Sequence, residues 1–347
     1  MISCVLPARD ASSTVVRALS SVLAEACVDE VVVVDDGSTD ATSARVLALG
    51  DPRVRLVRTP GLGVAGALAL GMRESKGELV ARMDADDVSS PGRIAACAEL
   101  LARDPSLGAA ASQVELVSDE PSPGFSAYVA WQNALVDAPA HAIARFVESP
   151  LCHPATVLRR SALEAVGGYR EASWPEDYDL FLRLAATGYG LAKVPRVLFA
   201  WHNHHPRRVT TNDARCDERA LVAARAHHLA PLLRARPGGF VVWGAGDAGK
   251  GLAKALRGEG LVPRAFVDVD PRKVGNLLEK VPIVGPAERP SGALVLVCLR
   301  ARGSRALASE QRALGEALQV SRSARDMVRE RLVNEGLVEG EGFLLTA

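Results

Sequence analysis

The chain has 347 residues, 48% of them hydrophobic, which is enough for more than one domain, and its formal net charge of +0 predicts no nucleic-acid partner. Its six cysteines are widely spaced and lack zinc-ligand patterns, so we expect reduced, mostly buried thiols in a cytoplasmic protein. Charged residues follow the first apolar run too early for a signal peptide, and no apolar run reaches the roughly 20 residues of a transmembrane helix, although peripheral membrane association stays open.

The first hundred residues alternate between predicted strands and predicted helices. Apolar or valine-rich runs predict buried strands at 2–6, within 30–40, at 54–58 and at 77–83. Helical spacing of apolar residues predicts helices between and after them, at 12–26 with Ser12 or Ser13 as N-cap, at 63–75, and following an N-cap at Ser90 and a first-turn Pro91. This order predicts a doubly wound α/β domain, in which ligands bind beyond the carboxyl ends of the strands.

Acidic residues gather where three of these strands end. Asp10 follows the first strand, Asp35 and Asp36 end the second, and a cluster at 84–87 follows the fourth. Because the carboxyl ends of parallel strands meet at one edge of a sheet, we expect these acids to line a common edge.

The cluster contains the pair Asp84 and Asp86, two residues apart. On extended backbone the two carboxylates face the same way, so they can share one hard divalent cation, Mg²⁺ or Mn²⁺, or one can bind the ion while the other accepts ribose hydroxyls. A chain of this length holds roughly one such pair by chance, and 177/179 and 268/270 share the spacing. The alternative is a solvated turn that caps the next helix, but the position after a buried strand favours the metal site.

Two further acidic groups have both a functional and a structural interpretation. Asp36 can accept hydrogen bonds from a base or a ribose, or it can form the turn that starts the next helix. Glu176 and Asp177 open a helix predicted within 173–188, where they either stabilise the helix dipole or supply a general base.

Six blocks of sequence occur in an order that resembles the family 2 glycosyltransferases of the GT-A fold. They are CVLPARDASSTVVRALSSVL, VVVVDDGSTDAT, GELVARMDADDVSSPGRI, HPATVLRRSALEAVGGYRE, WPEDYDLFLRLAATG and WHNHHPRRVT. The resemblance covers about residues 1–215. It implies transfer of a sugar, with inversion, from a nucleotide-diphosphate donor to a hydroxyl of a saccharide or lipid-linked acceptor. It also implies a place in the synthesis of cell-surface polysaccharide or glycoconjugate, and a UDP-type donor is favoured.

The resemblance also implies roles on the donor side of the site. Pro7 and Asp10 would line the base pocket, and Asp36 would contact the nucleoside. Asp84 and Asp86 match the family's DxD pair, which serves the ribose and the metal-bound diphosphate respectively. Asp10 stands where the family more usually has asparagine, which can alter the base contacts.

On the acceptor side, Asp177 matches the general base of the family and Glu176 would support it. His205, or His204, resembles a histidine near the metal and the diphosphate, and Arg208 could contact phosphate. This block has one additional residue compared with the usual family pattern, so the histidine assignment stays open.

A second unit is predicted after an Arg-Pro-Gly-Gly linker, which gives domains of 1–235 and 236–347. Its spacing fits a Rossmann fingerprint, formed by Gly244, Gly246, Gly249 and Asp268. In such a fingerprint the glycines let the backbone approach a pyrophosphate, and the acid binds a ribose hydroxyl. The negative charge of Asp247 inside the turn would repel a phosphate. The region resembles small Rossmann-like domains appended to some family 2 transferases. The second unit therefore has either a structural or regulatory role or a site for a nucleotide, nucleotide sugar or NAD(P).

Three other functions stay open. An NAD(P)-dependent oxidoreductase or epimerase would place its chemistry in the second unit, but the unit lacks a Tyr-xxx-Lys pair and about 110 residues leave little room for a substrate domain. A non-catalytic sensor of nucleotide sugars would share the pocket. A nucleotidyltransferase would need a glycine-rich basic loop after the first strand, and PARDASS has no glycine.

Overall fold

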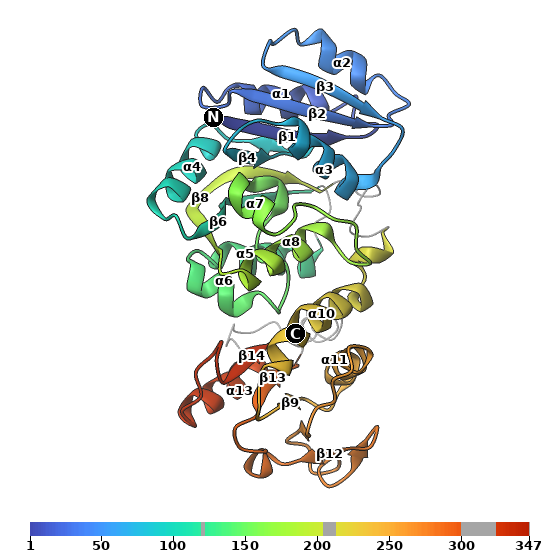
Figure 1. The fold of residues 1–347 in the computed structure, drawn as a ribbon, viewed down its shortest axis with the longest axis vertical. Helices are drawn as coiled ribbons and strands as arrows, with labels where there is room; N and C mark the ends of the chain where they lie inside the picture. The colour runs from blue at the N-terminus through green and yellow to red at the C-terminus, as the bar shows by residue number, and fades with distance from the viewer. Residues whose placement is uncertain (119–121, 204–212, 300–323, 347) are drawn as a thin grey trace, which may run out of the picture. The chain divides into compact units, whose positions relative to one another are not determined.

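The computed structural model describes residues 1–118, 122–203, 213–299 and 324–346, and these form two compact units (Figure 1). The first unit comprises residues 1–142 and 149–212, and the second comprises 143–148 and 213–347. Helix α10 (Glu218–Arg234) groups with the second unit, whereas the predicted boundary after residue 235 places it in the first.

A mixed sheet forms the centre of the first unit. Within the described residues it has eight strands, in the order β3 (Val54–Thr59), β2 (Glu30–Asp36), β1 (Ile2–Ala8), β4 (Leu79–Arg82), β7 (Thr156–Arg159), β6 (Leu107–Val117), β8 (Gly190–His202) and β5 (Val88–Ser89). The first four pair in parallel, which confirms the predicted doubly wound order, whereas β7 is antiparallel to both of its neighbours. The carboxyl ends of β2, β1 and β4 therefore share one edge.

Helices cover both faces of this sheet. Successive side chains of a strand point to opposite faces, and both sets are apolar and need to be buried. Cys4 and Leu6 of β1 belong to one buried cluster, and Val5 between them belongs to another. The first cluster includes residues of α1 (Val15–Leu23), α2 (Thr42–Ala48), α4 (Arg93–Arg103) and α5 (Pro123–Ala134). The second includes residues of α3 (Gly63–Glu74), α7 (Arg160–Ala165) and α8 (Glu176–Ala186). Helix α6 (Ala138–Ala144) follows α5 in the chain.

The start of α1 differs from the prediction. The helix begins at Val15, and neither Ser12 nor Ser13 is its N-cap. The backbone N–H of Ser12 instead donates to Asp40 at 3.0 Å, so this residue belongs to the loop between β1 and α1.

The predicted start of α4 at Ser90 and Pro91 is also wrong. The helix begins at Arg93, and a distant carboxylate satisfies its first N–H groups. Oε1 of Glu25 accepts from the backbone N–H of Ile94 at 3.0 Å, which is the role of a cap supplied from another element. Local sequence contains no sign of this contact.

The second unit is built on a smaller sheet. Its described residues form the strand order β11 (Leu277–Leu278), β12 (Val281–Val284), β10 (Phe266–Val267), β9 (Phe240–Trp243), β13 (Leu294–Val297) and β14 (Phe343–Leu345). All pairs except β11 with β12 are parallel. The α-helices in the described part of residues 213–347 are α10, α11 (Asp247–Gly258) and α13 (Ala324–Asn334). Counted along the chain, the parallel strands run 3-2-1-4-5, so the switch point lies between β9 and β13, next to the glycine turn.

Two expectations about the whole chain can be compared with the structure. All six cysteines lie in the described ranges and are free, and four of them are buried, as predicted. Among the described residues, no helix combines the length and the apolar character needed to cross a bilayer.

Candidate active site

The acidic turn after β4 brings three carboxylates together. Ligand oxygens of Asp84, Asp86 and Asp87 all lie within 4.8 Å of one another. The turn leads into β5, which pairs with the end of β8, and Nη2 of Arg17 on α1 donates to the carbonyl of Asp86 at 2.8 Å. Elements far apart in the sequence therefore fix the backbone of the DxD pair.

A buried arginine lies directly behind the turn. Arg82, the last residue of β4, is 3% exposed, and its Nη1 donates to Oδ1 of Asp84 at 2.5 Å. This ion pair orients one oxygen of Asp84 and leaves its other oxygen for a hydroxyl or a metal ion. Arg82 is a site residue that the predictions missed, although a charged residue inside an apolar strand was a usable signal.

Asp87 is the most deeply buried of the three acids. The residue is only 1% exposed, and its Oδ1 accepts a hydrogen bond from the backbone N–H of His202 at 2.7 Å. Its Oδ2 has no hydrogen-bond partner among the described residues. Burial, followed by the charges of Asp84 and Asp86, raises the pKa of Asp87 well above its usual value. An orphaned buried oxygen beside two carboxylates fits a hard divalent cation, which prefers oxygen ligands.

The second acidic group opens helix α8. Asp177 accepts a hydrogen bond from Oγ of Ser149, with 3.3 Å between Oγ and Oδ2. Glu176 lies close enough for its charge to act on both Arg82 and Tyr169. The helix begins at Glu176 as the sequence predicted, and its acids occupy the first turn, where they also favour the helix dipole.

The charges of both acidic groups act on the buried side chain of Tyr169. The pKa of its hydroxyl is raised chiefly by burial, and the charge of Arg82 lowers it. The charges of Glu176, Asp177 and Asp84 raise this pKa further. Both acidic loops therefore lie around one buried phenol. Nε2 of His153 is 2.6 Å from the Tyr169 hydroxyl oxygen, and burial, followed by the charge of Arg82, lowers the pKa of His153 well below its usual value. The imidazole is thus neutral.

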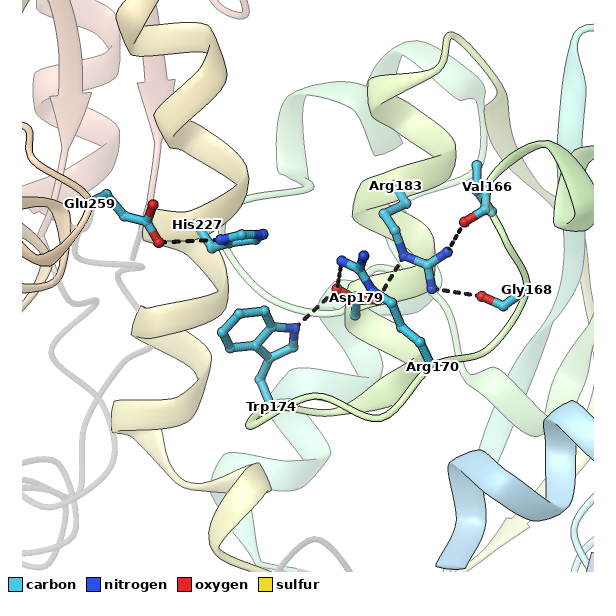
Figure 2. A network of polar contacts seen from close by, with 8 residues as sticks. All are labelled: Val166, Gly168, Arg170, Trp174, Asp179, Arg183, His227 and Glu259. Atoms are coloured by element: carbon cyan, nitrogen blue, oxygen red, sulfur yellow. Dashed lines mark hydrogen bonds and ion pairs between the residues drawn. The ribbon is translucent and has the colours of Figure 1, made fainter.

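A network centred on Asp179 fixes the loop that leads into α8 (Figure 2). Asp179 is fully buried and accepts from Nε and Nη2 of Arg170, both at 2.9 Å, from Nε1 of Trp174 at 3.1 Å and from Nε of Arg183 at 2.7 Å. Arg183 also donates to the carbonyls of Val166 and Gly168. The 177/179 spacing noted in the sequence is therefore not a metal pair, because Asp179 is occupied by its own structural contacts.

The predicted nucleoside contact Asp36 lies at the end of β2, where its carboxylate binds the loop before α3. Oδ1 accepts from Oγ1 of Thr59 and from the N–H of Leu62, both at 2.6 Å, and Oδ2 accepts from the N–H of Gly63 at 2.9 Å. Asp36 thus anchors the start of α3, and a nucleoside contact would use its remaining lone pairs.

The other predicted residues of the base pocket lie on β1 and just after it. Pro7 pairs with Val34 of the neighbouring strand β2. Asp10 adopts a positive φ of 48°, and its Oδ1 accepts from the N–H of Thr39 at 2.8 Å. The structure thus places both at the same edge of the sheet as the acidic turn, and their roles in donor binding stay predictions.

The histidine block extends past the end of β8. His202 is described, and its N–H donates to Asp87. His204, His205 and Arg208 lie outside the described residues.

The three glycines of the second unit differ in their surroundings. Gly244 has a φ of +110°, and a Cβ there would lie 2.7 Å from the carbonyl oxygen of Cys298. A Cβ at Gly249 would lie 1.9 Å from the carbonyl oxygen of Gly244, whereas one at Gly246 meets no described atom within 4 Å. These surroundings match the three roles of the fingerprint glycines. Gly244 allows the tight turn, Gly246 leaves room for a ligand to approach the backbone, and Gly249 allows the helix to pack closely on the turn.

The acid of this fingerprint is occupied by internal contacts. Oδ2 of Asp268 accepts from the N–H of Ala245 and from Nζ of Lys273, both at 2.9 Å, and Oδ1 accepts from the N–H of Asp270 at 3.0 Å. These contacts fix the glycine turn and compete with a ribose for the carboxylate.

The α/β sheet, with its acidic turn after β4 and a Glu-Asp helix start near the same buried phenol, defines the GT-A class of nucleotide-sugar transferase folds. Residues 3–167 match the family model described as glycosyl transferase family 2, and this part of the chain belongs to that family.

Relatives and a solved structure agree with this assignment. The succinoglycan biosynthesis protein ExoO of Rhizobium meliloti is 45% identical over 92 residues, which are 26% of either chain. An Escherichia coli UDP-Gal:alpha-D-GlcNAc-diphosphoundecaprenol beta-1,3-galactosyltransferase is 26% identical over 176 residues, 49% of this chain and 61% of that one. The crystal structure of S. aureus TarS 1–349 in complex with UDP-GlcNAc has a TM-score of 0.55 at 15% identity, covers 74% of this chain and 71% of that one, and shows the fold. The chain covers less than two thirds of the length of both sequence relatives.

Proposed function

We propose that the first unit transfers a sugar from a nucleotide-diphosphate donor, of the UDP type, to a hydroxyl of a saccharide or lipid-linked acceptor in polysaccharide or glycoconjugate synthesis. The observation that carries the proposal is the convergence of the acidic turn 84–87 and the acids of α8 on buried Tyr169. Relatives named for succinoglycan synthesis and for galactosyl transfer from UDP-Gal to GlcNAc-diphosphoundecaprenol support these substrate classes.

In this proposal the two acidic groups divide the chemistry. Asp177 takes the proton of the acceptor hydroxyl while that oxygen attacks the anomeric carbon, and the bond from this carbon to the diphosphate oxygen breaks in the same displacement, with inversion. Asp84 binds the ribose, and Asp86 holds a divalent ion. That ion, Mg²⁺ or Mn²⁺, stabilises the negative charge on the departing diphosphate when bound.

Replacing the proposed base tests this function. Asp177→Asn should lower turnover by about 100-fold or more, because the amide cannot accept the proton. Donor binding should stay close to that of the wild type. The measurement is release of nucleotide diphosphate in the presence of acceptor, with Glu99→Gln, an exposed change on α4, as the control. Wild-type turnover in Asp177→Asn would overturn the assignment of the base.

For the second unit we propose a structural or regulatory role. Its strand order and the open space at Gly246 favour the alternative of a bound nucleotide or NAD(P), whereas the internal contacts of Asp268 oppose it. A fluorescence titration of the full chain with NADH separates the two possibilities. No change in emission is expected, and saturable binding would favour the oxidoreductase function. A non-catalytic sensor would bind donor but release no nucleotide with any acceptor.

A further inference from the structure

The two oxygens of the Asp87 carboxylate have different surroundings. Oδ1 accepts from the backbone N–H of His202, and Oδ2 is buried without a hydrogen-bond partner in the described part of the chain. Leaving a carboxylate oxygen unpaired inside a protein is costly, and two further carboxylates next to it add repulsion. A cation at this position would remove both penalties.

The geometry of the turn fits such a cation. One ligand oxygen each from Asp84, Asp86 and Asp87 lies in a group whose members are all within 4.8 Å of one another. Arg82 occupies Oδ1 of Asp84, so its other oxygen is available for the ion. Proteins usually hold Mg²⁺ through one or two carboxylates and rely on substrate phosphates for the rest. A third carboxylate would let the site bind its ion before the nucleotide arrives.

The same carboxylate connects this position to strand β8. Besides the bond from His202 to Asp87, Val88 pairs with Ala200, and the N–H of Ser90 donates to the carbonyl of Leu198 at 2.9 Å. The acidic turn and the last residues of β8 are therefore held together by two backbone contacts and by the Asp87 side chain.

We infer that Asp87 is a further ligand of the divalent ion and that it couples occupancy of the metal site to the end of β8. The nucleotide-free protein binds the ion through three carboxylates, and the bound ion stabilises the His202–Asp87 hydrogen bond. This inference rests on the proposed function only in assuming a divalent ion at the acidic turn. If Asp87 were a structural acceptor alone, it would hold β8 with or without the ion.

Titration of the nucleotide-free full chain with Mn²⁺, followed by calorimetry, tests the inference. Asp87→Asn keeps an acceptor oxygen for His202 but loses the charge, so the Mn²⁺ affinity should fall by about 10-fold or more. Glu99→Gln should bind Mn²⁺ as the wild type does. Unchanged affinity in Asp87→Asn, or failure of the wild type to bind Mn²⁺, would overturn the inference.

Amide hydrogen exchange on the wild type gives a second measurement that needs no variant. Mn²⁺ should slow exchange at the His202 amide, and an unchanged rate would contradict the coupling to β8. The outcomes also separate this inference from the proposed function. Sugar transfer with unchanged Mn²⁺ affinity in Asp87→Asn removes the inference alone. Binding of Mn²⁺ that depends on Asp87, without any transfer, removes the proposed function alone.

Discussion

At the scale of single residues, the surroundings of an aspartate decide what it does. Asp179 is saturated by two arginines and a tryptophan, Asp36 is occupied by the start of α3, and Asp87 keeps one oxygen without a described partner. The sequence shows all three as acids near the end of a strand or the start of a helix. It cannot separate them, because the groups that occupy them come from other loops.

The Asp179 network should be important for stability. Asp179→Ala leaves the guanidinium of Arg183, which is 9% exposed, without its carboxylate, and we expect a loss of about 3–5 kcal/mol in the free energy of unfolding. Glu99→Ala removes an exposed pair with Arg103 and should change stability by less than about 0.5 kcal/mol. Chemical denaturation of both variants measures the difference. Equal effects would show that the network contributes little.

His141 should make the first unit sensitive to acid. The side chain is buried, and burial, followed by the charge of Lys193, lowers its pKa to about 3, far below the ordinary value for histidine of about 6.5. As the pH falls below 6.5, the unfolded chain binds a proton that the folded chain does not, so stability decreases. At pH 5 this amounts to about 2 kcal/mol. His141→Leu should weaken the loss of stability between pH 7.5 and pH 5 by that amount, as measured by denaturation at both pH values. An unchanged pH dependence would assign the acid sensitivity to other groups.

At the scale of elements, helix α11 offers a matched pair of glycines. A Cβ at Gly249 would overlap the carbonyl oxygen of Gly244, whereas one at Gly251 meets no described atom within 4 Å. The first glycine allows close packing of helix on turn, and the second only adds flexibility to the unfolded chain.

Gly249→Ala should therefore destabilise the second unit by more than about 2 kcal/mol, because backbone atoms must move to admit the methyl group. Gly251→Ala should be neutral or stabilise it by up to about 1 kcal/mol. Thermal unfolding of the full chain compares the two. Similar melting temperatures for both variants would contradict the packing at the turn.

Much of the element order could be predicted from the sequence, whereas element ends could not. Strands β1, β3 and β4 and helix α3 lie within about two residues of their predicted positions, and β2 and α8 lie inside the predicted ranges 30–40 and 173–188, because apolar periodicity is local information. The start of α4 was missed because its acceptor is Glu25, far away in the chain. In the site, the DxD pair and the acids of α8 were predicted, but Arg82, Asp87 and Ser149 gain their roles only from tertiary contacts.

At the scale of the whole molecule, the two units differ in how their acidic residues are used. The first places its acidic loops around one buried phenol, and the second has a dinucleotide-type strand order whose key acid is occupied by its own turn. For the first unit we propose that the carboxylates of the β4 turn bind a metal ion and that this ion would hold the diphosphate of the donor.

Donor binding measured with and without metal tests this claim most directly. A thermal-shift series with UDP-sugars should stabilise the wild type only when Mn²⁺ is present, by about 2.7 kcal/mol at a donor concentration of 100 times Kd. Asp86→Ala should lose this stabilisation, and Asp177→Asn should retain it. Equal stabilisation without Mn²⁺, or full stabilisation of Asp86→Ala, would contradict the account.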